Sequence, residues 1–256
     1  MAVALGMEGV LRRCAMSYAV LLLAGCKPGS SPDDIRAQTF GSPNKLVAAA
    51  GGDLFATTCA QCHGPQGQGN EQLKAPSIAA RPAWYVLAQL KNFHMGRRGA
   101  NPADVQGTQM ATIAKGLSEE QMKAMAEKVE SLPLVVPPAP VALRNPDVEE
   151  GRYIFTERCM ECHRYNGSGE MTFGSPPLIG LPDWYLLAQI DKFKNGWRGV
   201  DPNDPNGLKM KFSSLYIESE QAKHDVVAFI LSLNPSAEDA AATAETTVVA
   251  PAADGN

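Results

Sequence analysis

The residues best suited to chemistry are cysteines and histidines arranged in two identical frames. The frames are "CAQCH" at residues 59–63 and "CMECH" at residues 159–163. Residues three apart on a helical turn share a face, so both thiols of a frame can reach one flat ligand, and the next residue places an imidazole beside it. This spacing is the attachment signature of covalent haem. It assigns Cys59, Cys62, Cys159 and Cys162 to attachment, and His63 and His163 to the two irons.

Other uses of paired cysteines fit less well. A redox dithiol of the thioredoxin type has a βαβ context, which does not surround these frames, and a zinc ribbon places its knuckles about 15–20 residues apart. Here the frames are 100 residues apart. Four cysteines in an exported chain could also form two disulfides. The immediately following histidine favours haem, so the sequence predicts two covalently bound haem c groups.

The chain is a tandem duplication with a period of 100 residues. Residues 81–110 align without a gap to residues 181–210, with 14 of 30 positions identical. A fixed internal period is the sign of a repeated structural unit. We therefore predict two similar domains, each holding one haem.

Two methionines close the aligned segment. Met110 and Met210 each lie 51 residues after the first cysteine of their frame. A loop methionine that keeps its register, while its neighbours change from Gln and Ala to two lysines, indicates a bound partner. A thioether is a soft ligand, and methionine opposite histidine raises the potential of cytochromes c. We predict the axial pairs His63/Met110 and His163/Met210; packing in the core is the alternative.

The remaining pattern predicts an all-α fold, with a helix–loop–helix–loop–helix order in each repeat. Apolar residues recur at helical spacing around each frame and along "WYVLAQLKNF" and "WYLLAQIDKF". Gly96 and Gly196 are expected to end those helices. "SEEQ" at 118–121 predicts a capping box. Arg98 and Arg198 follow the middle helices, where they could pair with a haem propionate or remain solvated.

The N-terminus reads as an export signal. Arg12 and Arg13 precede an apolar run of about 11 residues, shorter than the roughly 20 that span a bilayer. "LAGC" at 23–26 resembles the lipobox of bacterial lipoproteins, which would make Cys26 the lipidated first residue of the mature chain. Cleavage without a lipid is the alternative. We expect the signal over 1–26, a flexible tether over 27–44 and a disordered tail over 236–256.

The motifs together resemble the class I c-type cytochromes and, as a tandem pair, the di-haem cytochrome c4 group. The resemblance implies two all-α cytochrome c domains, at 45–133 and 147–235, joined by a proline-rich linker at 134–146. It also implies that the carbonyl groups of Pro76 and Pro176 fix the axial histidines, although turn prolines are the simpler reading. One departure is Arg164, where repeat 1 has the common glycine, Gly64.

The expected function is periplasmic electron transfer with no catalytic residue and no small-molecule substrate. The partners would be a membrane oxidase, reductase or dehydrogenase, with the membrane reached through the lipid. A net charge of −4 and the absence of basic runs argue against nucleic acid. We expect unequal haem potentials, haem 2 being the higher. The alternatives are a lipid-anchored subunit of a membrane complex and a di-haem peroxidase, which needs one reachable iron.

Overall fold

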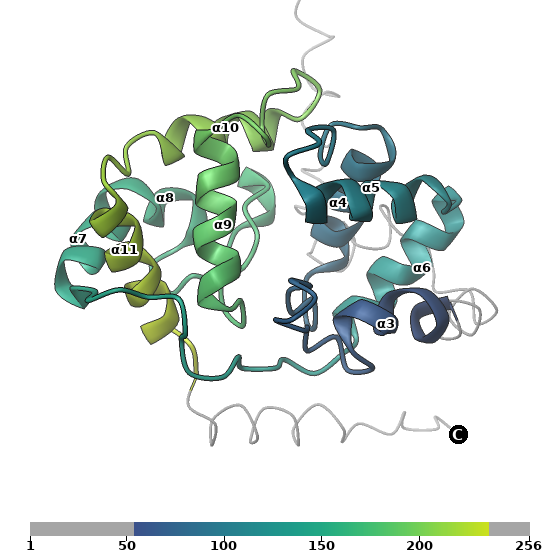
Figure 1. Cartoon of the computed structure of the whole chain (residues 1–256), viewed down its shortest axis with the longest axis horizontal. Coiled ribbons are helices and arrows are strands. Elements are labelled where there is room, and N and C mark those ends of the chain that lie inside the picture. Colours follow the sequence, from purple (N-terminus) through teal and green to yellow (C-terminus); the bar gives the residue numbers. More distant parts are fainter. Residues whose placement is uncertain (1–53, 236–256) are drawn as a thin grey trace, which may run out of the picture. The chain divides into compact units, whose positions relative to one another are not determined.

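A computed structural model describes residues 54–235 of the chain (Figure 1). The expected signal peptide, Cys26, the tether and the C-terminal tail lie outside these described residues. Within them the regular structure is helical, with two isolated antiparallel bridges and no strand. The all-α prediction is therefore confirmed. No helix between residues 54 and 235 combines the length and the apolar character needed to cross a bilayer.

The two repeats share the order of their main helices, and repeat 2 has in addition the short helix η2. Repeat 1 contains η1 (Phe55–Cys59), α3 (Ala60–His63), α4 (Ala83–His94), α5 (Val105–Lys115) and α6 (Glu119–Glu130). Repeat 2 contains α7 (Val148–Arg158), α8 (Met160–His163), η2 (Met171–Phe173), α9 (Asp183–Lys194), α10 (Pro205–Ser214) and α11 (Glu220–Ser232). The helix pairs α4/α9 and α5/α10 begin 100 residues apart, so the duplication seen in the sequence is also a duplication of structure.

Several helix ends form as the sequence predicts. Ser118 accepts a hydrogen bond from the Gln121 backbone, and the Gln121 side chain accepts one from the Ser118 backbone, which completes the capping box. Gly96 and Gly196 follow α4 and α9 with φ of 71° and 69°. This left-handed conformation suits glycine and stops the helix there. These predictions are confirmed.

The methionine segments are not loops, which corrects the sequence-based prediction. Met110 lies within α5 and Met210 within α10. Asp104 and Asp204 start these helices, because each carboxylate accepts a hydrogen bond from the glycine three residues on, at 2.8 and 3.0 Å. Each repeat therefore has a helix at its methionine that was not predicted, and each methionine is held on a capped element.

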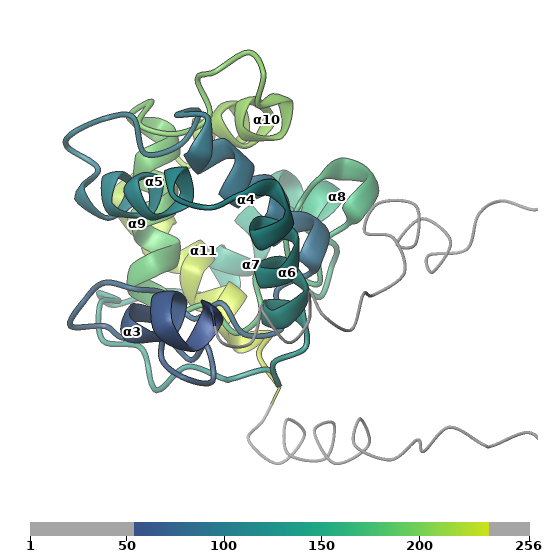
Figure 2. The same cartoon turned by 90° about the vertical axis from the view of Figure 1, so that its right-hand side faces the viewer.

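Each domain has a core of its own. In domain 1, α4 packs against α5 and α6 (Figure 2), and Phe55, Met125 and Val129 are buried together. In domain 2, α7 packs against α11 around Phe155 and Val226. Phe55 and Phe155 occupy matching positions, four residues before the first cysteine of each frame. The cores therefore hold the segments that carry the cysteines and histidines.

The crossing of α7 and α11 depends on Gly151. A Cβ at this position would lie 1.9 Å from the carbonyl oxygen of Asp225. We expect Gly151→Ala to lower the free energy of unfolding of the holoprotein by about 2 kcal/mol, because the two backbones would have to separate. Denaturant unfolding followed by circular dichroism measures this. Gly116→Ala is the matched control, since its nearest contact would be 3.4 Å away; equal stability of the two variants would contradict the prediction.

Candidate haem centres

The first candidate centre is a cavity of about 470 Å³ at the cysteine frame of domain 1, and residues of domain 2 also contribute to its lining. Its lining includes Cys59, Cys62, His63 and Met110. The cysteines come from the junction of η1 and α3, the histidine ends α3, and the methionine is supplied by α5. The structure thus brings together residues 51 positions apart in one mostly apolar pocket.

The second centre repeats this arrangement in domain 2. Cys159, Cys162, His163 and Met210 line one cavity of about 150 Å³, together with apolar residues of α9 and α11. Both methionines are half-buried. Their presence in the histidine-lined cavities agrees with the predicted axial pairs, and the bond from sulfur to iron remains a prediction.

The histidines of the two frames are fixed by proline carbonyl groups. His63 Nδ1 lies 2.8 Å from the carbonyl oxygen of Pro76, and His163 Nδ1 lies 3.0 Å from that of Pro176. A carbonyl oxygen only accepts, so Nδ1 must carry the proton in each ring. Nε2 then keeps its lone pair free for a metal. Burial lowers the pKa of both imidazoles, which further favours the neutral form that binds iron.

The cysteines are poorly suited to dithiol redox chemistry. Burial raises the pKa of Cys59 to about 11 and that of Cys159 to about 12. A reactive dithiol instead needs a lowered pKa. No disulfide joins any of the four cysteines of the two frames. Within residues 54–235, no three His, Cys, Asp or Glu side chains gather as a metal ion would require. The residues fit covalent haem better than any of the alternatives.

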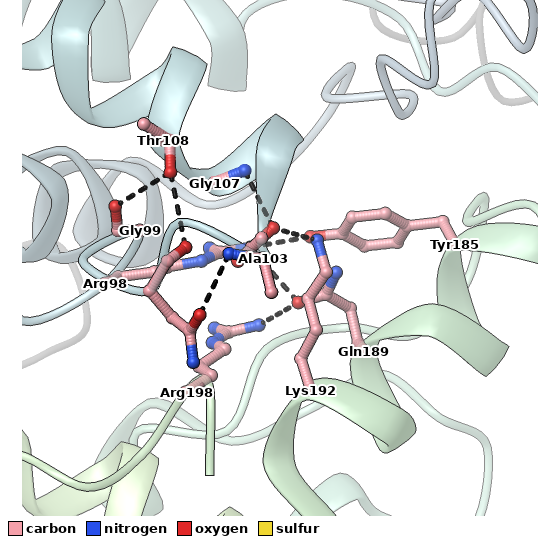
Figure 3. Close-up of polar contacts among 11 residues, drawn as sticks. Arg98, Gly99, Ala103, Gly107, Thr108, Tyr185, Gln189, Lys192 and Arg198 are labelled. Atoms are coloured by element: carbon pink, nitrogen blue, oxygen red, sulfur yellow. Dashed lines mark hydrogen bonds and ion pairs between the residues drawn. The ribbon is translucent and has the colours of Figure 1, made fainter. Parts of the chain in front are cut away.

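Arg98 and Arg198 are buried, so the solvated reading of these residues is wrong. Figure 3 shows both guanidinium groups reaching Gln189. Arg98 donates to Gln89 at 2.8 Å and to the Tyr185 hydroxyl at 3.2 Å. Reciprocally, Arg198 donates to Gln89 at 2.9 Å and to the hydroxyl of Tyr85 at 3.3 Å. Each arginine therefore binds one glutamine of each domain, so the contacts across the interface have a pseudo-twofold pattern.

This arginine network lies between the two cavities. Tyr85, Gln89, Tyr185 and Gln189 each line both of them. Burial opposes ionisation of Tyr185, but the cations of Arg98 and Arg198 outweigh it and lower the pKa of this phenol. From the sequence, these tyrosines and glutamines were predicted only to lie on a helix face, and their role at the interface was missed. The same residue types occur at the matched positions of both repeats, which was the available signal of a shared role.

Two further contacts across the interface have no counterpart in the other repeat. Lys192 Nζ lies 2.6 Å from Asp104 Oδ1, and Arg81 donates to the carbonyl oxygens of Pro177, at 2.8 Å, and Ile179. Asp104 therefore caps α5 and also binds domain 2. The repeat positions of Arg81 and Lys192 hold Leu181 and Asn92. The sequence did not predict these contacts, because Arg81 and Lys192 lie at positions where the two repeats differ.

Arg164, which stands where repeat 1 has Gly64, adopts a backbone conformation that lowers the stability of the fold. Arg164 adopts φ 65° and ψ 158°, and Gly64 occupies the same position with φ 78° and ψ 156°. This region is nearly restricted to glycine, and a side chain there costs about 1–3 kcal/mol. We expect Arg164→Gly to raise the free energy of unfolding by about 1 kcal/mol, since the exposed ion pair with Glu170 contributes little in return. Chemical denaturation measures the change. Gly64→Ala should have the opposite sign, and a loss of stability in Arg164→Gly would contradict the argument.

Comparison with known proteins agrees with this geometry. The profile of the family described as cytochrome c matches residues 48–133 and 148–234. The chain is 33% identical over 172 residues to a thiosulfate dehydrogenase electron acceptor of Stutzerimonas stutzeri, covering 64% of this chain and 75% of that protein. It is 28% identical over 162 residues to a cbb3-type cytochrome c oxidase subunit FixP of Sinorhizobium medicae, covering 59% and 53%.

The fold has a relative among solved structures. Acidithiobacillus ferrooxidans cytochrome c4 superposes with a TM-score of 0.54 at 27% identity, covering 69% of this chain and 99% of that one. The family profile matches both repeats, and both repeats place their cysteines and histidine in one cavity. The chain therefore belongs to the cytochrome c family, as a cytochrome c4-like tandem pair of domains that transfers electrons through two covalently bound haem c groups.

Proposed function

We propose that this di-haem cytochrome accepts electrons in the periplasm from a dehydrogenase of the thiosulfate dehydrogenase type and passes them on one at a time. Two similar proteins, from Stutzerimonas stutzeri and Thiomonas intermedia, are named thiosulfate dehydrogenase electron acceptor, at 33% and 34% identity. The chain covers 75% and 67% of their lengths. This coverage supports the acceptor role over the alternative of an oxidase subunit, because the chain covers only 53% of FixP.

Electron transfer, rather than catalysis at iron, is supported by one observation. In each repeat a histidine and a methionine line the same cavity. With His63/Met110 and His163/Met210 as axial pairs, neither iron has a position open to a substrate. Bound haem supplies one-electron exchange between Fe(III) and Fe(II). The chain's own residues hold the imidazoles in one tautomer, exclude water and set the polarity around the group. A peroxidase would need one of the methionines to be absent from its iron.

Arg98 and Arg198 fit the role of haem-propionate partners. Every hydrogen-bond partner of the two guanidinium groups within residues 54–235 is neutral. Arg198 Nε is buried and has no partner among these residues. A buried cation needs a counter-charge, and propionates are carboxylates that can accept from a guanidinium. The prolines Pro76 and Pro176 would complete each centre by fixing the histidine.

The two haems should differ in potential, with haem 2 the higher. Arg164 does not contribute as a free cation, because Glu170 pairs with it and that contact holds the pKa of Glu170 at about 2. The difference therefore rests on Lys209 and Lys211 beside Met210, where repeat 1 has Gln109 and Ala111. A nearby cation favours the reduced iron. A redox titration with one unsplit wave would contradict this expectation.

The acceptor role is tested by direct electron transfer. The ferric holoprotein is mixed with thiosulfate and thiosulfate dehydrogenase from Stutzerimonas stutzeri, and the reduced-haem absorbance is followed. We expect thiosulfate-dependent reduction of both haems. Reduction by dithionite but not by the enzyme would contradict the acceptor role. Copurification with membrane oxidase subunits would instead support the subunit role. Lipidation at Cys26 is a separate question, which mass spectrometry of the exported chain tests.

A further inference from the structure

Ser77 carries a buried hydroxyl group that has no hydrogen-bond partner among residues 54–235. The residue is 3% exposed, and its Oγ is itself buried. Folded proteins rarely leave such a group unpaired, because a buried hydroxyl without a hydrogen bond is destabilising. Ser214, which is also buried, shows the usual arrangement, since its Oγ donates to the carbonyl oxygen of Lys211 at 2.7 Å. Ser77 is therefore placed to donate to a group that binds beside it.

The loop around Ser77 is the one that orients the histidine of domain 1. The carbonyl oxygen of Pro76 accepts from His63 Nδ1 at 2.8 Å. The N–H of Ile78 donates to the carbonyl oxygen of Gly67, also at 2.8 Å. The backbone on both sides of Ser77 is thus held by hydrogen bonds. Ser77 and His63 line the same cavity, so the hydroxyl belongs to the site that holds haem 1.

The lining of the domain 1 cavity is rich in cations and, among residues 54–235, includes no aspartate or glutamate. Two of its cations, Lys74 and Lys192, have acidic partners outside the lining. The other two are the buried arginines Arg81 and Arg98, whose hydrogen bonds within the described residues go to neutral groups. A buried cation needs a counter-charge, so the group bound in this cavity is expected to bring negative charge.

In haem c, the propionates are the groups that match this environment. The vinyl groups become thioethers with the cysteines, and the ring nitrogens bind the iron, which leaves two carboxylates as anionic hydrogen-bond acceptors. A serine hydroxyl can donate to a carboxylate, and such a charge-assisted bond is short and strong. The repeat position of Ser77 is Pro177, which has neither a hydroxyl nor an N–H. Domain 2 therefore has no donor at this position.

We propose that Ser77 is a positioning residue of haem 1, whose hydroxyl donates a hydrogen bond to a propionate of that haem. Ser77 lines the domain 1 cavity and not the domain 2 cavity, which assigns the donor to haem 1. The bond disperses the negative charge of the carboxylate, and less negative charge near the iron favours Fe(II). Ser77 therefore raises the potential of haem 1 and narrows the difference from haem 2. The inference rests on the proposed electron-transfer site and is independent of the redox partner.

Ser77→Ala tests the proposal in the holoprotein. Spectroelectrochemical titration measures the potentials of both haems, and resonance Raman spectroscopy measures the propionate-bending bands, which respond to hydrogen bonding at the carboxylates. We expect the equilibrium constant for reduction of haem 1 to fall about three- to tenfold, while that of haem 2 stays unchanged. One propionate band should move. A Cys62→Ala background identifies the wave of haem 1, because that haem keeps one vinyl group and absorbs at longer wavelength.

Two further variants separate the hydroxyl from its surroundings. Ser77→Thr keeps the hydroxyl and should keep the parental potential of haem 1. The matched control is Ser175→Ala, which gives domain 2 the residue that domain 1 has at position 75. Ser175 lines the domain 2 cavity and is 9% exposed, but its Oγ is not among the buried atoms that lack a partner. The potential of haem 1 should be unchanged in this control.

Other results would overturn the proposal. An unchanged potential and an unchanged Raman band in Ser77→Ala would mean that the hydroxyl binds water. Equal shifts of both haems in Ser77→Ala, or a shift of haem 1 in Ser175→Ala, would mean that the contact between the domains has changed. A loss that Ser77→Thr fails to restore would mean that packing sets the potential. None of these measurements uses thiosulfate dehydrogenase, so failure of thiosulfate-dependent reduction would contradict the acceptor role alone.

Discussion

Replacing Met210 with alanine is expected to change the ferric haem of domain 2 from low-spin to high-spin, while the haem of domain 1 stays low-spin. Met210 lines the same cavity as His163, whose Nδ1 is held by Pro176. Removing the thioether leaves the iron with one protein ligand and an open position. Methionine ligation also raises the potential, so the potential of haem 2 should fall by on the order of 0.1–0.2 V.

Electron paramagnetic resonance of the ferric holoprotein measures the spin change for each haem. Two low-spin signals are expected in the parent chain, one low-spin and one high-spin signal in Met210→Ala, and the reverse assignment in Met110→Ala. Met95→Leu is the matched control, because Met95 is 57% exposed, follows α4 as its C-cap and lines neither of the two cavities. A high-spin signal in the parent, accompanied by peroxide turnover, would show an open iron and favour the peroxidase.

The cysteine and histidine frames could be predicted from the sequence because their chemistry is local. Two thiols three residues apart and a following imidazole define a site within a single turn, whatever surrounds it. The proline contacts of His63 and His163 are 13 residues away in sequence. These two contacts were predicted from the resemblance to the family. Nothing in the composition of the loop distinguishes a carbonyl group that binds histidine from one in an ordinary turn.

The helical state of the methionine segments was missed because apolar periodicity was the main signal. "VQGTQMATIAK" and "PNGLKMKFSS" are weakly amphipathic, so they resemble loops by that measure. The start signals were nonetheless present. Asp204 is followed by Pro205 in the first turn, an arrangement typical of a helix N-terminus, and Asp104 occupies the same position in repeat 1.

The interface could not be predicted, because it depends on how two folded domains meet. Tyr85, Gln89 and Arg98 are identical to their repeat partners, and haem contact within one domain explains such identity equally well. Only the structure shows that Arg98 reaches Tyr185 and Gln189 of the other repeat. The asymmetric contacts of Arg81 and Lys192 were harder still, since they occur where the repeats differ.

The arginine network should make the two domains unfold together. Arg198→Leu leaves the hydroxyl of Tyr85 without a charged donor in a buried interface, and removes one of the two arginine donors from both Gln89 and Gln189. We expect the free energy of unfolding to fall by about 3 kcal/mol, because hydrogen bonds to a charged group are lost and polar groups stay desolvated. Arg152→Leu is the control; Arg152 is exposed on α7 and, among residues 54–235, pairs only with Glu149, so its change should stay within about 0.5 kcal/mol.

The double variant decides whether this network acts as a unit. Arg98 and Arg198 share both glutamines, so each glutamine keeps one arginine donor in a single variant and loses both in the double variant. The cost of replacing both arginines by leucine should therefore clearly exceed the sum of the single costs. Calorimetry of the holoprotein should show one transition in the parent and two in the double variant, as the domains separate. Additive costs with a single transition would mean that the arginines stabilise each domain independently. Coupling between the two domains would then have to rest on Arg81 and the ion pair of Lys192 with Asp104, which also cross the interface.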